Sequence, residues 1–198
     1  MLQSSFTPDK IEAGCDEVGR GCLAGPVVAA AVILPKNFQH NWLNDSKKLK
    51  AQKRQELDNI IKSEALAWAI AEVSPQEIDQ INILKASFKA MHLALDQLTL
   101  KPELLLIDGN RFIPYKKLNY HCIIKGDGKF LSIAAASVLA KNYRDELMEK
   151  LAHQFPGYGW ERNVGYPTKE HRTGIEQLGV TPHHRMSFQL LPIQGELF

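Results

Sequence analysis

The 198-residue sequence lacks the features of membrane-spanning, secreted or disulfide-rich proteins. Its three cysteines (Cys15, Cys22 and Cys122) include no Cys-x-x-Cys pair, which argues against a disulfide framework or a structural zinc site. The longest run without a charged residue, 21–35, contains Pro26 and is shorter than the roughly 18–20 apolar residues of a membrane-spanning helix. Because no basic stretch leads into an apolar one at the N-terminus, we expect no secretory signal and a cytoplasmic location.

A large excess of one charge is also absent. Lys and Arg total 24 against 22 Asp and Glu, and this net charge of +2 is too small by itself to indicate a nucleic-acid partner. The hydrophobic share of 44% and the charged share of 23% are typical of a globular protein and exclude a mainly disordered, collagen-like or coiled-coil chain. The length predicts one domain, which we expect to act as a monomer because no amphipathic helix is left over for an interface.

The hydrophobic pattern predicts an α/β fold. Expected strands cover 11–18, 27–34, 65–73, 104–107 and 121–124. Expected helices cover 46–61, 82–98 and 131–151, with a further helix that opens at Ser74-Pro75. From Phe155 onward Gly, Pro, Tyr and His become frequent, so the chain is divided into a core, 1–154, and a smaller C-terminal subdomain and tail, 155–198, packed as part of the same domain.

Acidic residues fall where the apolar strands end. Asp16 and Glu17 close the first strand, Asp108 closes the leucine-rich strand, and Asp127 follows the last strand. Neighbouring strands lie only ~5 Å apart, so carboxylates gathered there would repel one another unless cations neutralised them. Such hard oxygen ligands favour Mg²⁺ or Mn²⁺. Each acid alone could be a solvated loop residue, but their recurrence at three strands favours a metal site.

Two glycine-rich segments do not fit known nucleotide-binding motifs. Gly19-Arg20-Gly21 and the following Gly25 are one residue out of register for Gly-x-Gly-x-x-Gly, and they lead into a strand instead of a helix. The segment 126–129 lacks the spacing of a P-loop. Both nucleotide-fold interpretations are therefore excluded.

Together these residues resemble the bacterial ribonuclease HII family. The matching motifs occur in the family's order at 16–21, 24–27, 45–49, 107–109, 125–127, 133–137, 140–141, 144–145, 165–168, 171 and 184–188. The resemblance implies a ribonuclease H-like fold, with a mixed five-stranded sheet flanked by helices and a small helical C-terminal subdomain. It also implies an endoribonuclease that hydrolyses the RNA strand of RNA–DNA hybrids and cuts 5′ of single ribonucleotides embedded in duplex DNA, in ribonucleotide removal from DNA.

The resemblance also implies residue roles. Asp16, Glu17, Asp108 and Asp127 match the family's metal-binding carboxylates, which implies catalysis with two Mn²⁺ or Mg²⁺ ions that leaves a 3′-hydroxyl and a 5′-phosphate. The sequence departs from the family after the fourth acid, where Gly-Lys-Phe (128–130) replaces the more usual Ser and polar residues.

Junction recognition is implied for four residues. Gly19, Arg20 and Gly21 match the loop that reads the ribose 2′-hydroxyl, and Tyr166 matches the aromatic residue that packs against the sugar. Glycines on both sides of Arg20 would let the backbone approach the minor groove, where the 2′-hydroxyl separates RNA from DNA.

Several basic residues have two open interpretations. We favour phosphate contact by Ser46 and Lys47 over a solvated helix start. Lys141 and Arg144 are either surface charges or phosphate ligands, and Arg185 is either structural or faces a phosphate.

The remaining residues are given structural interpretations. Asp145 is expected to pair with a nearby base, and Cys15 is expected to be a small buried hydrophobe. Three histidines, His171, His183 and His184, invite a zinc interpretation, but their neighbours are basic and no cysteine accompanies them, so we do not adopt it.

The last five residues, Gln194-x-x-Leu197-Phe198, resemble the short peptide by which bacterial replication and repair proteins bind the sliding clamp, although a frayed tail is the simpler alternative.

Two rival functions stay open. One is a hybrid-specific enzyme without junction preference. The other is a non-catalytic hybrid-binding module, which the intact set of four acids disfavours because a phosphate-facing binding site would favour Lys or Arg.

Overall fold

The computed structural model describes residues 2–41, 43 and 51–192. Five strands form one sheet in the order β3-β2-β1-β4-β5. Their bounds are β1 Glu12–Val18, β2 Val27–Ile33, β3 Ala67–Val73, β4 Leu104–Asp108 and β5 Asn119–Ile123. The first three strands pair antiparallel, whereas β4 pairs parallel with β1 and β5 pairs parallel with β4. The predicted mixed five-stranded α/β sheet is therefore confirmed.

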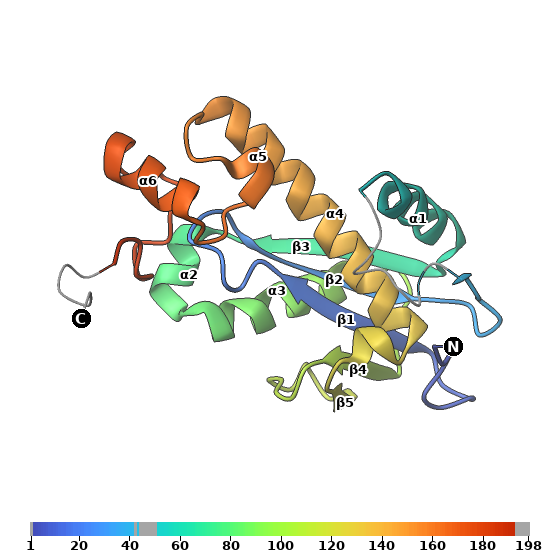
Figure 1. Ribbon diagram of the computed structural model, residues 1–198. Coiled ribbons are helices and arrows are strands. Elements are labelled where there is room, and N and C mark those ends of the chain that lie inside the picture. The colour runs from blue at the N-terminus through green and yellow to red at the C-terminus, as the bar shows by residue number, and fades with distance from the viewer. Residues whose placement is uncertain (1, 42, 44–50, 193–198) are drawn as a thin grey trace.

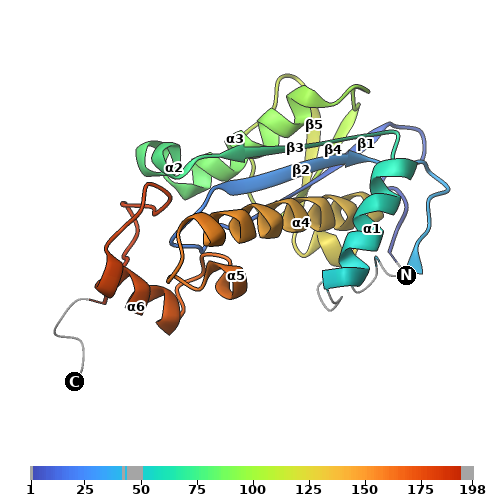
Figure 2. The ribbon, with the colours of Figure 1, turned by 90° about the horizontal axis from the view of Figure 1, so that it is seen from above.

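Helices cover both faces of this sheet (Figures 1 and 2). Their bounds are α1 Ala51–Glu64, α2 Pro75–Ile81, α3 Ile83–Gln97, α4 Leu131–Gln154, α5 Trp160–Asn163 and α6 Lys169–Leu178. α1 and α4 lie on one face, and α2 and α3 lie on the other (Figure 2). α5 lies beside the C-terminal half of α4, and α6 lies beyond the C-terminal end of that helix (Figure 2). No helix in the described part of the chain is long and apolar enough to span a membrane.

Alternation along β2 explains the two main cores. Val27, Ala29 and Ala31 pack toward α3, and the intervening residues Val28 and Ala30 pack toward α4. All seven residues of β2 are buried, as predicted for a strand covered on both faces. A third cluster joins the C-terminal half of α4 to the segment after it. The division at residue 154 stays a prediction.

The small residues at the start of α4 allow this helix to lie very close to β1. A Cβ atom on Gly14 of β1 would stand 2.3 Å from the backbone carbon of Ser132, so no larger residue fits there without movement. Ala134, Ala135 and Ala136 are fully buried along the same part of α4. This close packing brings the α4 residue Ser137 beside Asp16 on β1.

Element boundaries differ from the predicted ones at several ends. α1 continues three residues past the expected end to Glu64, and its expected start at 46 lies outside the described residues. The edge strand β5 begins at Asn119, two residues before the predicted start at 121. β5 lies at the edge of the sheet, where polar residues are tolerated.

Candidate active site

The four predicted metal ligands come from neighbouring parallel strands. Asp16 and Glu17 are adjacent near the C-terminal end of β1, and Asp108 is the last residue of β4. Asp127 lies on a short 3₁₀ turn, 126–128, that follows β5. Since β1, β4 and β5 run parallel, their C-terminal ends meet at one edge of the sheet.

Three of these acids line one cleft of about 300 Å³. Its walls are formed by Asp16, Glu17, Val18, Arg54, Asp108, Ser137, Val138, Lys141 and Tyr166. Asp127 is buried and is not among the lining residues. It is held next to the cleft because the backbone N–H of its neighbour Gly126 donates to Oδ1 of Asp108 at 2.6 Å.

The acids destabilise one another's charged forms. Burial raises the pKa of Asp16 well above its usual value, and the charges of Asp108 and Glu17 raise it further. Hydrogen bonds from Ser137 and from the backbone N–H of Glu17, the latter at 2.8 Å, oppose this rise. Burial also raises the pKa of Glu17, and the guanidinium of Arg20, 3.0 Å away, counteracts it.

This donor set suits a hard divalent cation. Carboxylate oxygens are the ligands such cations prefer, and a bound cation would relieve the repulsion that raises the pKa of Asp16. Within residues 2–41, 43 and 51–192, however, no three His, Cys, Asp or Glu side chains are already close enough to hold an ion.

The glycine-arginine-glycine loop after β1 presents one charged side chain. Arg20 and Gly21 are exposed, whereas Gly19 is buried with φ +93°. A Cβ atom on Gly19 would stand 2.2 Å from Nε of Arg144, so glycine is required both by the backbone conformation and by the space.

Arg144 on α4 is a fully buried side chain that binds this loop. Its guanidinium donates to the carbonyls of Ala24 and Pro26, both at 3.0 Å, and to that of Val164 at 2.8 Å. Both interpretations from the sequence, a surface charge or a phosphate ligand, were wrong because this side chain is fully enclosed. Its actual effect is to join the loop after β1 to the segment that carries Tyr166.

Arg185 has a similar position. Its side chain is fully buried and donates to the carbonyls of Gly25 at 2.9 Å and Arg20 at 3.0 Å. Of the two interpretations left open for Arg185, a structural role or contact with a phosphate, the burial of the side chain favours the structural one. Arg185 supports the loop that presents Arg20.

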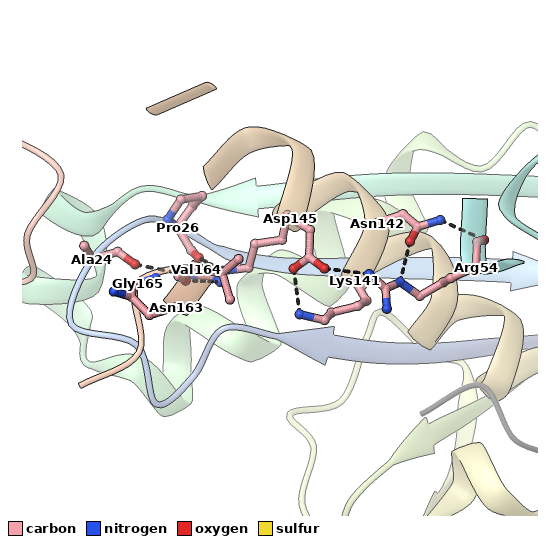
Figure 3. Close-up of polar contacts among 10 residues, drawn as sticks. Ala24, Pro26, Arg54, Lys141, Asn142, Asp145, Asn163, Val164 and Gly165 are labelled. Atoms are coloured by element: carbon pink, nitrogen blue, oxygen red, sulfur yellow. Dashed lines mark hydrogen bonds and ion pairs between the residues drawn. The ribbon is translucent and has the colours of Figure 1, made fainter. Parts of the chain in front are cut away.

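A network of polar side chains beside the cleft joins α1 to α4 (Figure 3). Asp145 accepts from Arg54 at 2.8 Å and from Lys141 at 2.6 Å, which confirms the expectation that Asp145 pairs with a base. Asn142 also holds Arg54 in place, because its Oδ1 accepts from Nε of Arg54 at 2.6 Å. Arg54 had no distinguishing signal in the sequence, since it is one of several cations in a polar helix.

Tyr166 lies on the segment between α5 and α6 and is 41% exposed on the wall of the cleft. Burial of part of the ring raises the pKa of its hydroxyl, which also interacts with Cys22. The remaining predicted contacts of the substrate (Ser46 and Lys47) and of the sliding clamp (Gln194, Leu197 and Phe198) lie outside the described residues. Cys15 is fully buried, as predicted.

A sheet of this topology, with acids from three parallel strands beside a cleft that also carries cations, defines a nuclease of the ribonuclease H-like class. The family profile described as Ribonuclease HII matches residues 13–191. Ribonuclease HII of Bacteroides thetaiotaomicron is 60% identical over 191 residues, which are 96% of each chain. The chain therefore belongs to the ribonuclease HII family.

Solved structures agree with this assignment. Ribonuclease H2 from Pyrococcus horikoshii superposes with a TM-score of 0.75 at 25% identity, covering 90% of this chain and 94% of that one. Ribonuclease HII from Archaeoglobus fulgidus, solved in a complex with PCNA, gives 0.74 at 27% identity and covers 95% and 100%. The protein is a ribonuclease H, a hydrolase and endonuclease that acts on RNA–DNA hybrids.

Proposed function

We propose that this ribonuclease H also cuts duplex DNA on the 5′ side of a single embedded ribonucleotide, leaving a 3′-hydroxyl and a 5′-phosphate, in the removal of ribonucleotides from DNA. It would act as a monomer in the cytoplasm. The observation that carries the proposal is that one side chain binds both the loop that contains Arg20 and the segment that carries Tyr166. Arg144 binds the loop after Arg20 and the segment before Tyr166 through one guanidinium, so both elements keep a fixed position beside the acids.

Asp16, Glu17, Asp108 and Asp127 would hold the divalent ions, which we propose to be two Mg²⁺ or Mn²⁺. When bound, such ions activate a water molecule and neutralise the charge that develops on the leaving oxygen. The mutual repulsion of Asp16 and Asp108 favours cation binding when both groups are ionised, because a bound cation relieves it.

The other residues of the cleft would bind and orient the substrate. Lys141 and Arg54, which line the cleft, would supply positive charge for the phosphate backbone. The exposed peptide groups around Gly21 would approach the minor groove and recognise the 2′-hydroxyl, while Tyr166 would pack its ring against the sugar. Direct phosphate contacts by Ser46 and Lys47 remain part of this proposal.

Comparison of two substrates with matched tyrosine variants tests the junction role. Tyr166 and Tyr143 are each 41% exposed, but Tyr143 does not line the cleft. We expect Tyr166→Ala to reduce cleavage of duplex DNA with one ribonucleotide by about 10–100-fold and to reduce cleavage of a long hybrid much less. Tyr143→Ala should leave the ratio of the two activities unchanged.

Equal losses on both substrates with Tyr166→Ala would leave a hybrid-specific nuclease without junction preference. Cleavage of the hybrid alone by the unmodified protein would have the same meaning. A protein that binds the hybrid but cuts neither substrate with Mg²⁺ or Mn²⁺ would favour the binding module.

We also propose that the C-terminal peptide binds the bacterial sliding clamp through Gln194, Leu197 and Phe198. The Archaeoglobus fulgidus relative was solved in complex with PCNA, which supports a clamp partner for this chain. An extended peptide that ends in Leu-Phe can fill an apolar groove without disturbing the fold. Binding of the purified clamp should be lost when 194–198 is deleted, and retention of binding would refute this assignment.

A further inference from the structure

The position of Tyr166 depends on hydrogen bonds, because the segment between α5 and α6 has no regular structure around it. The carbonyl of Tyr166 accepts from the backbone N–H of Thr168 at 2.8 Å. The same carbonyl lies 2.9 Å from Nδ1 of His171, a fully buried residue of α6. The imidazole therefore links the cleft-lining segment to the interior of the C-terminal part.

The partners of His171 determine where its proton lies. Its Nε2 accepts from Nε1–H of Trp160 at 2.9 Å, and an indole N–H can only donate. A carbonyl oxygen can only accept, so Nδ1 must carry the hydrogen that bonds to Tyr166. The ring of His171 is therefore neutral, with its hydrogen on Nδ1.

His184 directs a second N–H group toward Nε2 of His171. Its Nδ1 accepts from the backbone N–H of Thr181 at 2.9 Å, which leaves the hydrogen of the neutral ring on Nε2. That Nε2 lies 3.2 Å from Nε2 of His171. The N–H groups of Trp160 and His184 thus share the single lone pair of His171 Nε2, and this nitrogen is an acceptor in both contacts.

We propose that His171, kept as its Nδ1–H tautomer by Trp160 and His184, is a positioning residue that sets the orientation of Tyr166 toward the ribose at an RNA–DNA junction. This inference rests on the proposed role of Tyr166 in junction recognition. His171 itself does not line the cleft, so its effect passes through the Tyr166 peptide group.

The surroundings keep both rings neutral at physiological pH. Burial lowers the pKa of His171, and burial together with His171 lowers the pKa of His184 to about 4. The charged or titratable neighbours act in the same direction, since Arg172 disfavours a proton on His171 and His183 disfavours one on His184. A second hydrogen on His171 would also point at the N–H of Trp160.

Two substitutions of His171 separate the tether to Tyr166 from simple packing. The amide nitrogen of Asn lies as many bonds from Cα as Nδ1 does, so His171→Asn can still donate to the Tyr166 carbonyl. Gln places its amide near the position of Nε2, so His171→Gln can accept from Trp160 but loses the donor to Tyr166.

We expect His171→Gln to lower the ratio of junction cleavage to hybrid cleavage by about 10–100-fold and His171→Asn to keep it within about 3-fold. Equal ratios for both variants, or a loss that is the same on both substrates, would overturn the inference. Tyr166→Ala is measured beside them. An unchanged ratio in Tyr166→Ala would instead refute the proposed function on which the inference rests.

A measurement on the unsubstituted protein keeps the test decisive where a variant does not fold. Long-range ¹H–¹⁵N spectra assign the tautomer of each histidine from its two nitrogen shifts. Between about pH 6 and 8 His171 should be the neutral Nδ1–H form and His184 the neutral Nε2–H form. An imidazolium or the reversed tautomer at His171 would overturn the inference.

Discussion

Replacement of Arg144 by Met removes the guanidinium while retaining most of the apolar volume of the side chain. The guanidinium makes three hydrogen bonds to carbonyls of two separate segments, and the residue is fully buried. Hydrogen bonds from a charged donor contribute roughly 1.5–3 kcal/mol each, and the relief of burying a charge offsets part of the loss. We therefore expect Arg144→Met to lower the free energy of unfolding by about 3–5 kcal/mol.

Urea unfolding and thermal melting measure this loss. For a protein of this length a change of 1 kcal/mol shifts the melting temperature by about 2–4 °C, so Arg144→Met should melt about 6–20 °C lower. Below its melting temperature the variant should lose more activity on the single-ribonucleotide duplex than on the hybrid, because Arg144 no longer holds the loop after β1 and the segment of Tyr166 together.

Arg162→Met is the matched control. Arg162 has a 65% exposed side chain whose ion pairs with Glu161 and Glu170 lie at the surface, and such pairs contribute at most about 1 kcal/mol. If Arg144→Met were destabilised no more than this control, the argument that the Arg144 guanidinium holds the two segments together would be refuted.

The acids and the loop carry three more predictions. Asp16→Asn should abolish hydrolysis but retain hybrid binding. In chelator at neutral pH it should also raise the melting temperature, because the repulsion of Asp16 by Asp108 and Glu17 is removed. A lower melting temperature would contradict this. The raised pKa of Asp16 means that the native state keeps the Asp16 proton to a higher pH than the unfolded state does. In chelator, the stability of the unsubstituted protein relative to Asp16→Asn should therefore fall as pH rises from the ordinary carboxyl range, and excess Mg²⁺ should restore it. A difference that does not change with pH would count against the repulsion. Gly19→Ala should lower the free energy of unfolding in urea by about 2 kcal/mol or more, because φ of residue 19 is +93° and the added Cβ would clash with Arg144. Gly128→Ala is the control and should lower it far less, because no atom lies within 4 Å of the Cβ position there. Equal losses would refute the steric argument.

The sequence was sufficient to predict the sheet and the position of the acids. Continuous apolar runs such as 27–34 indicate strands buried on both faces, and the small residues in the first half of α4 indicate close packing on the sheet. Acids at the ends of neighbouring strands were expected to lie close together because neighbouring strands are only ~5 Å apart; the parallel pairing of these strands was not predicted. The exact arrangement was not predictable, and Asp127 lies beside the cleft without lining its wall.

Buried polar residues were much harder to interpret. Arg144 and Arg185 occur among surface-like charged residues in the sequence, and their enclosure depends on loops more than a hundred residues away. His171 and His184 are only 13 residues apart, but their contact depends on how the chain turns after α6. A histidine carries no local signal that separates a surface residue from a buried hydrogen-bond relay, so the sequence left their role open.

The most direct test of the central claim is to map the cut in duplex DNA that contains one ribonucleotide, with Mg²⁺, Mn²⁺ or a chelator. We predict a single metal-dependent break on the 5′ side of the ribonucleotide, with a 3′-hydroxyl on one fragment and a 5′-phosphate on the other. A break on the 3′ side, a 2′,3′-cyclic phosphate, or cleavage that persists in chelator would contradict this account.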